Sequence, residues 1–252
     1  MAEVYDCSDS TQLLAAARAA RQTLGRGGLV VLPTDTVYGI AADAFTPEAV
    51  DALLMAKGRG RQSPPPVLIA DTATLGALAA HVTEPIRAMA EAFWPGPLTI
   101  VLDANPSLSW DLGDTGGTVA LRIPNHPLTL ELLRETGPLA VSSANKTGEP
   151  AANQVSEAQS MLGDEVDIYL DAGIADGDGV ASTIVDATGI TADGGTLRIL
   201  REGGVSVEAL SKVLPNVTIL GLHESSTASD SADSDGSTAN ADDAAGAAPT
   251  EA

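Results

Sequence analysis

The chain has 252 residues with a formal net charge of −21, and 44% of its residues are hydrophobic while only 3% are aromatic. Its single cysteine, Cys7, excludes an internal disulfide and a thiolate metal cluster, and nothing near it resembles a base that would activate it as a nucleophile. No apolar run reaches the roughly 18 residues of a membrane span, and the acidic N-terminus lacks the basic start of a signal peptide. We therefore expect a cytoplasmic protein with an aliphatic core and no membrane association.

The negative charge is spread unevenly along the chain. Seven acidic and no basic residues lie from Glu224 onward, which leaves −14 on residues 1–223. From His223 to Ala252 the composition is reduced to small and polar residues, so this acidic tail (223–252) is predicted to be disordered. The preceding residues, 1–222, are predicted to form a single domain.

Taken in order, the first elements lead to a polar turn. Helical spacing predicts a helix over 10–24, and an apolar run predicts a buried strand over 28–32. Pro33 ends this strand, and Thr34-Asp35-Thr36 follows directly. Thr46-Pro47-Glu48 is typical of a helix start, with the helix running to about Ala56 and 57–61 forming a flexible basic loop.

The remaining elements alternate between strands and helices. We predict strands over 67–69, 98–102, 118–123, 139–141, 166–170, 182–186, 197–200 and 217–220, and helices over 75–80, 84–93, 128–135, 156–162 and 206–213. This alternation predicts an α/β fold built on one sheet flanked by helices.

Polar and charged side chains gather where predicted strands end. They are Thr34-Asp35-Thr36, the Lys57/Arg59 loop, Arg122, Ser142 to Asn145, Ser182-Thr183 and Arg201. If the strands are parallel neighbours, these ends meet at one edge of the sheet, where open α/β sheets bind ligands. Hydroxyls, an amide and several cations suit a ligand that carries phosphates and a carboxylate. With no obvious nucleophile or general base, the reaction would depend on positioning and charge neutralisation.

Other familiar signals are absent or weak. The sequence has no Walker A pattern, and no G-x-G-x-x-G follows a strand. Ser143 and Lys146 form S-x-x-K, and Lys146 also begins K-T-G, but penicillin-binding enzymes need two different lysines for these motifs. The three histidines are isolated, which argues against a zinc site.

Seven stretches together resemble the YrdC/Sua5 family of L-threonylcarbamoyladenylate synthases. In the family's order, between about residues 12 and 215, they are Pro33-Thr34-Asp35-Thr36-Val37-Tyr38-Gly39, Lys57-Gly58-Arg59, Trp94-Pro95-Gly96-Pro97-Leu98-Thr99, Arg122-Ile123-Pro124-Asn125-His126-Pro127, Ser143-Ala144-Asn145-Lys146-Thr147-Gly148, Ser182-Thr183-Ile184-Val185-Asp186 and Arg201-Glu202-Gly203. The chain is similar to the short, single-domain form, because only the acidic tail follows where longer relatives carry another domain. It differs from many relatives after Arg59, where Gly60-Arg61 stands in place of proline.

The resemblance implies a fold and an activity. The fold is a twisted, open, mixed α/β sheet with a concave basic surface. The activity is a nucleotidyltransferase reaction that combines L-threonine, bicarbonate and ATP into threonylcarbamoyl-AMP and pyrophosphate. Partner proteins then transfer the threonylcarbamoyl group to adenosine 37 of tRNA. Magnesium would accompany ATP, but no residue cluster indicates a protein-built metal site.

The resemblance also implies roles for nine residues. Lys57 and Arg59 would bind the ATP phosphates as catalytic residues. Thr34, Arg122 and Ser182 would contact threonine, with Arg122 the partner of its carboxylate. The residues on the nucleotide side would be Thr118, Ser143, Asn145 and Arg201. The alternative for Ser143 and Asn145 is a turn that bonds its own backbone.

A second function class stays open at this stage. Some members of the family are associated with binding double-stranded RNA, and a concave basic face could serve that purpose without synthase activity. The net charge of −14 on residues 1–223 argues against strong non-specific RNA affinity.

Overall fold

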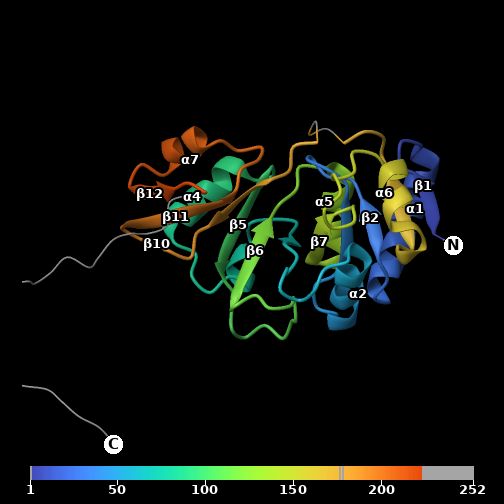
Figure 1. Cartoon of the computed structure of the whole chain (residues 1–252), viewed down its shortest axis with the longest axis horizontal. Helices are drawn as coiled ribbons and strands as arrows, with labels where there is room; N and C mark the ends of the chain where they lie inside the picture. The colour runs from blue at the N-terminus through green and yellow to red at the C-terminus, as the bar shows by residue number, and fades with distance from the viewer. Residues whose placement is uncertain (1, 176, 178, 223–252) are drawn as a thin grey trace, which may run out of the picture.

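The computed structural model describes residues 2–175, 177 and 179–222, so the tail predicted over 223–252 lies outside the described residues. Within them, twelve strands form one mixed sheet, in the order β1-β8-β2-β3-β7-β4-β6-β5-β9-β11-β10, with β12 also paired to β11 (Figure 1). The strands are β1 (Glu3–Asp6), β2 (Val30–Leu32), β3 (Gly39–Asp43), β4 (Val67–Leu68), β5 (Leu98–Asp103), β6 (Thr118–Arg122), β7 (Leu139–Ser143), β8 (Ile168–Asp171), β9 (Thr183–Asp186), β10 (Ile190–Thr191), β11 (Gly194–Arg201) and β12 (Val217–Leu220). This confirms the predicted open, mixed α/β fold.

Helices flank the sheet. They are α1 (Ser10–Gly25), α2 (Pro47–Lys57), α3 (Leu75–Leu78), α4 (Glu84–Phe93), α5 (Pro127–Thr136), α6 (Val155–Leu162) and α7 (Val207–Val213), with one 3-10 turn at Gly163–Glu165. The start of α1 is capped by Asp9, whose carboxylate accepts a hydrogen bond from the backbone N–H of Thr11 at 2.8 Å.

The half of the sheet that contains β2 and β3 is covered by helices on both faces. Successive side chains of these strands point to opposite faces. Val31 and Ile40 pack with α2 and α6, whereas their neighbours Val30 and Ala41 pack with α1 and α5. Because both faces are buried, these strands are continuously apolar. Figure 1 shows this half beside the half that contains β5, β11, α4 and α7.

The second half of the sheet has its own large aliphatic core. Met89 of α4 and Leu210 of α7 are fully buried there with residues of β5, β6, β9 and β11. At the end of α4, the indole N–H of Trp94 donates to the carbonyl of Leu98 at 2.7 Å. This bond closes the turn that leads into β5.

The structure confirms the predicted helices and all nine predicted strands, but it corrects three expectations. First, β1, β3 and β10 were missed. Second, the Thr34-Asp35-Thr36 turn joins antiparallel neighbours β2 and β3, so it does not lie between a strand and a helix. Third, the premise of parallel neighbours holds for only some pairs, such as β4 with β6 and β5 with β9. The strands β3, β7 and β4 pair antiparallel, as do β5 and β6 and also β9 and β11. The polar residues nevertheless line one cleft, which receives them from both edges of the sheet, because Thr118 begins β6 and Arg122 ends it.

Candidate anion-binding cleft

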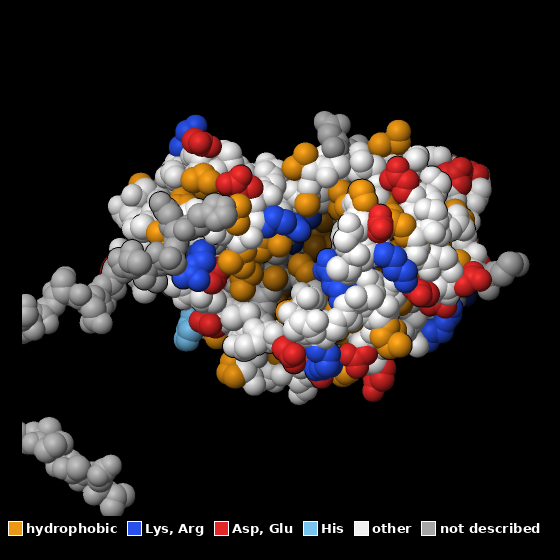
Figure 2. Space-filling model, in the orientation of Figure 1, with side chains coloured by type: hydrophobic (Ala, Val, Ile, Leu, Met, Phe, Trp, Pro, Cys, Tyr) orange, Lys and Arg blue, Asp and Glu red, His pale blue; other side chains and the backbone are white. Residues whose placement is uncertain are grey.

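A cleft of about 540 Å³ opens near the middle of the sheet. Figure 2 shows the hollow, with Lys or Arg side chains on both sides of it and hydrophobic side chains on its floor. Eight of the nine candidate residues line it: Thr34, Arg59, Thr118, Arg122, Ser143, Asn145, Ser182 and Arg201. The ninth, Lys57, lies behind the wall.

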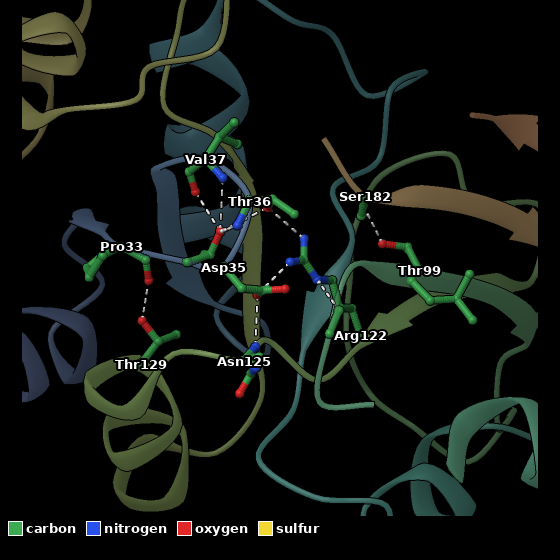
Figure 3. Close-up of polar contacts among 12 residues, drawn as sticks. Pro33, Asp35, Thr36, Val37, Thr99, Arg122, Asn125, Thr129 and Ser182 are labelled. Carbon is green, nitrogen blue, oxygen red and sulfur yellow. Dashed lines mark hydrogen bonds and ion pairs between the residues drawn. The ribbon is translucent and has the colours of Figure 1, made fainter. Parts of the chain in front are cut away.

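Arg122 is the most constrained cation of the cleft. It ends β6, is 7% exposed, and lies among partners from two turns (Figure 3). Its Nη2 donates to Asp35 Oδ1 at 2.7 Å, its Nη1 to Thr36 Oγ1 at 3.1 Å, and its Nε to the Gly96 carbonyl at 3.0 Å. Burial lowers the pKa of Arg122, and the carboxylate of Asp35 partly offsets this effect.

Asp35 links the two turns that hold this guanidinium. Its Oδ1 also accepts a hydrogen bond from the backbone N–H of Asn125 at 2.8 Å, so the β2–β3 turn is joined to the β6–α5 connection (Figure 3). Thr34 stabilises the same turn from within, because its hydroxyl donates to the carbonyl of Val37 at 2.6 Å. The hydroxyl-rich turn therefore arranges the arginine rather than simply capping a strand.

A second polar group lies across the cleft. Ser182, just before β9, is 5% exposed, and its hydroxyl lies 2.9 Å from that of Thr99 on β5 (Figure 3). Arg201, at the end of β11, donates from Nη2 to the Ser182 hydroxyl at 2.9 Å and to the Ser182 carbonyl at 2.7 Å. β9 pairs with β5 and β11, so these three residues come from adjacent strands.

Three guanidinium groups share this space. Burial lowers the pKa of Arg201, and the positive charges of Arg122 and Arg59 lower it further. Arg59 is held at the side by Thr147, whose hydroxyl accepts its Nε at 3.0 Å. Among the described residues, Asp35 is the one carboxylate that forms an ion pair with any of the three. With three guanidinium groups against the carboxylates of Asp35 and Glu149, the cleft has a local excess of positive charge in an otherwise acidic protein.

Lys57 differs from the prediction in its position. The predicted flexible loop is wrong at this residue, because Lys57 is the last residue of α2 and its side chain is fully buried. Gly58, in the left-handed conformation at φ 67°, ends the helix there. The ammonium donates to the carbonyls of Ser143 and Asn145, the latter at 2.7 Å, and to Asn145 Oδ1 at 3.3 Å. Burial, then repulsion from Arg59 and Lys146, lowers the pKa of Lys57 to about 7.

The remaining candidates, Asn145, Ser143 and Thr118, also line the cleft. Asn145 is 5% exposed, and its Nδ2 donates to the carbonyls of Lys146 and Glu149 at 2.9 and 2.7 Å. The self-bonded turn foreseen as the alternative for Asn145 is therefore present. Ser143 ends β7, and Thr118, at the start of β6, donates its hydroxyl to the carbonyl of Thr115 at 2.8 Å.

Sequence reasoning assigned no role to several residues of this network. Thr36 and Thr99 both line the cleft and bond Arg122 and Ser182 directly. The Gly96 carbonyl on Arg122 explains what the Trp94–Thr99 stretch contributes to the site. Thr99 belongs to one of the seven stretches that resemble the family, but nothing in a single sequence shows that β5 and β9 pair. The contact therefore could not be foreseen.

Two kinds of feature are absent from the described residues. They contain no group of three or more His, Cys, Asp or Glu side chains that could hold a metal ion. Within the same residues, no helix combines the length and the apolar character that crossing a membrane requires.

A cationic, hydroxyl-lined cleft on an open α/β sheet defines a protein that binds small anionic ligands. The family model for Sua5/YciO/YrdC, described as "Telomere recombination", matches residues 22–203. The chain belongs to the Sua5/YciO/YrdC family.

Relatives of known name agree with the assignment of the chain to this family. A Mycobacterium tuberculosis protein named "Putative threonylcarbamoyl-AMP synthase" is 50% identical over 214 residues, which cover 85% of this chain and 96% of that protein. The Bacillus subtilis threonylcarbamoyl-AMP synthase is 36% identical over 197 residues, covering 77% and 55% of the two chains.

Solved structures agree with the sequence relatives. The structure of Sua5 from P. abyssi complexed with L-threonine matches with a TM-score of 0.74 and 33% identity, over 81% of this chain and 58% of that one. This chain therefore spans less than two thirds of that protein. E. coli YciO, with a TM-score of 0.70 and 20% identity over 83% of this chain and all of that one, shows the shared fold alone.

Proposed function

We propose that this chain is an enzyme that makes threonylcarbamoyl-AMP and pyrophosphate from L-threonine, bicarbonate and ATP. The observation that carries the proposal is the convergence of Arg59, Arg122 and Arg201 on one hydroxyl-lined cleft. Relatives named threonylcarbamoyl-AMP synthases, at up to 50% identity over most of the chain, support it.

The chemistry of the reaction suits a cleft without a nucleophile. The amine of threonine takes up the carbon of bicarbonate with loss of water, which gives a carbamate. A carbamate oxygen then attacks the α-phosphorus of ATP, and the bond to pyrophosphate breaks. The attacking group is already anionic, so the main task is to hold mutually repelling anions in line and to neutralise charge as pyrophosphate leaves.

Arg122 would bind the carboxylate of threonine. Among the described residues, three of its five N–H groups have partners, which leaves one on each terminal nitrogen for a bidentate contact. Thr34 and Ser182, the other proposed threonine contacts, line the same cleft. Asp35 compensates part of the buried charge and fixes the direction in which the guanidinium faces.

The nucleotide would occupy the side that includes Arg59, Thr118, Ser143, Asn145 and Arg201. Arg59 and Arg201 would contact phosphates directly. Lys57 would contribute its positive charge from beneath the Ser143–Asn145 turn, and a direct phosphate contact would require its ammonium to exchange a carbonyl partner. Magnesium would arrive with ATP on phosphate oxygens and water, because the described residues offer no carboxylate cluster to hold it.

The product is a reactive mixed anhydride, so we propose that partner proteins use it to modify adenosine 37 of tRNA. Both steps would take place in the cytoplasm.

Pyrophosphate release from ATP tests the proposal. Release should require both L-threonine and bicarbonate, and Arg59→Met should lower it by about a hundredfold, because a donor to the developing charge is lost. Equal release with serine, or without an amino acid, would refute the assignment. If release is absent but RNA binds with an affinity that survives moderate salt, the RNA-binding module becomes the better account.

A further inference from the structure

Arg61 joins helix α2 to the β5–β6 connection, which lines the cleft through Leu112 and Thr115. Its Nη1 lies 3.0 Å from Asp51 Oδ1 on α2, and its Nη2 forms an ion pair with Asp111 in the β5–β6 connection. In the sequence, Gly60 and Arg61 follow Arg59 directly. The proposed function gives Arg59 a role in binding phosphates but gives no role to Arg61.

The backbone strengthens this connection. The carbonyl of Arg61 accepts a hydrogen bond from the N–H of Asp114 at 2.8 Å, and Asp111 Oδ1 accepts one from the N–H of Gly113 at 3.1 Å. Gly113 has a φ of +100°, and a Cβ on it would lie 2.6 Å from the Arg61 carbonyl oxygen. Only glycine permits this approach. Segment 111–114 is therefore docked on Arg61 through both its side chain and its backbone.

The β5–β6 connection and the chain that follows Arg61 both line the cleft. Leu112 and Thr115 line it from the β5–β6 connection, directly before Thr118 begins β6, and residues 64–66 line it from the chain that follows Arg61. Leu112 is only 3% exposed, so the segment is packed inward and not merely resting on the surface. A second anchor is Trp110, which stacks on Phe45 with ring centroids 5.5 Å apart.

The charges agree with a fixed arrangement. The hydrogen bonds from Gly113 and from Arg61 lower the pKa of Asp111, and Asp111 followed by Asp51 raises that of Arg61. All three side chains are 44–50% exposed, so the pairs are screened by salt and contribute little to global stability. Their effect should therefore be seen in the geometry of the cleft wall.

We propose that Arg61 is a positioning residue for the nucleotide. It joins segment 111–115 to the chain around residues 59–66 and so fixes the part of the cleft wall that leads to Thr118. The proposal rests on the proposed function for the identity of the ligand, ATP.

Three variants test it. Arg61→Ala removes both ion pairs, Arg61→Lys retains a cation without the planar fork that reaches two carboxylates, and Asp111→Asn removes one pair from the other side. The matched control is Arg21→Ala, which breaks an equally exposed pair with Glu135 at 3.1 Å, with neither residue in the cleft.

We expect Arg61→Ala to raise the KM for ATP by about fivefold to tenfold while kcat and the KM for threonine stay within about twofold. Arg61→Lys should be intermediate, and Arg21→Ala should match the wild type. Adding Asp111→Asn to Arg61→Ala should have no further effect, because the two residues act through one contact. An unchanged KM for ATP, equal changes for both substrates, or the same change in Arg21→Ala would overturn the proposal.

Calorimetric titration with ATP separates this proposal from the proposed function. If the wild type releases no pyrophosphate but binds ATP, and Arg61→Ala binds it more weakly than Arg21→Ala does, the positioning role survives while the activity fails. If Arg61→Ala lowers the melting temperature by more than Arg21→Ala does, the proposal is judged on Asp111→Asn alone. A raised KM for ATP with an unchanged KM for threonine then supports the positioning role, and an unchanged KM for ATP overturns it.

Discussion

Replacing Lys57 tests how the buried ammonium supports the cleft. Lys57→Ala removes a fully buried side chain and leaves the Asn145 carbonyl without its 2.7 Å donor. An unpaired buried acceptor costs about 1–3 kcal/mol, and deleting a buried four-carbon side chain costs about 2–5 kcal/mol. Together these predict a loss of at least about 3 kcal/mol and a melting temperature lower by roughly 10 °C.

Lys57→Met separates the two contributions. Methionine keeps most of the apolar volume but has no donor, so it should recover the packing part of the lost stability. Turnover should stay about a hundredfold below the wild type in both variants, because the charge next to the phosphate site is missing in each. Lys212→Ala on α7 is the control, because Lys212 is exposed and does not line the cleft.

The pKa of Lys57 gives this prediction a pH signature. Burial lowers the pKa from 10.5 to about 7 in the folded protein, so between these two values the unfolded chain binds more protons. Stability attributable to Lys57 should therefore rise with pH from about 7 to 10.5 and show no slope below about 7. Lys57→Met should lack this rise.

The assays are thermal melts, pyrophosphate release at saturating ATP, and denaturant unfolding from pH 7 to 9.5. A Lys57→Met protein with wild-type turnover would remove the ammonium from the mechanism. A Lys57→Ala protein that melts with the wild type would refute the burial argument, and parallel pH slopes in Lys57→Met and wild type would refute the lowered pKa.

Two further substitutions examine the threonine side of the cleft. Asp35→Asn leaves the Arg122 charge uncompensated in a pair whose side chains are 8% and 11% exposed, so we expect a loss of about 3 kcal/mol in unfolding free energy and a raised KM for threonine; a melt and KM values for both substrates would check this, and an unaltered melt would contradict it. Thr99→Val removes one hydroxyl at nearly constant volume and should weaken L-threonine binding by about fivefold through Ser182, with ATP affinity unchanged, as measured by calorimetry; equal weakening of both ligands would argue for a general disturbance of the cleft.

The sequence predicts the helices and the polar strand ends well, because these depend on local patterns. The helix-start pattern Thr46-Pro47-Glu48 identifies α2, and the apolar run before Pro33 identifies β2. It misses β3, because Gly39-Ile40-Ala41-Ala42 has little β-branched character and becomes a strand only by pairing with β2 and β7.

The depth of a residue is equally difficult to infer from sequence. Lys57 follows a helix and precedes Gly58 and Arg59, which in sequence is typical of an exposed basic loop. Its burial depends on the turn after β7, 86 residues further along the chain at Ser143, whose carbonyl needs a donor. Such a pairing of distant backbone and side chain leaves no local trace.

The charge distribution predicts that this cleft favours small anions over nucleic acid. A surface with net charge −14 over residues 1–223 repels a polyanion at long range, whereas the three arginines act only within the hollow, where screening is weak. A triphosphate and an amino acid carboxylate are small enough to reach the three cations in that hollow, but a duplex must also face the rest of an acidic protein. The same arrangement that makes RNA a poor ligand therefore raises the selectivity for the substrates of a nucleotidyl transfer.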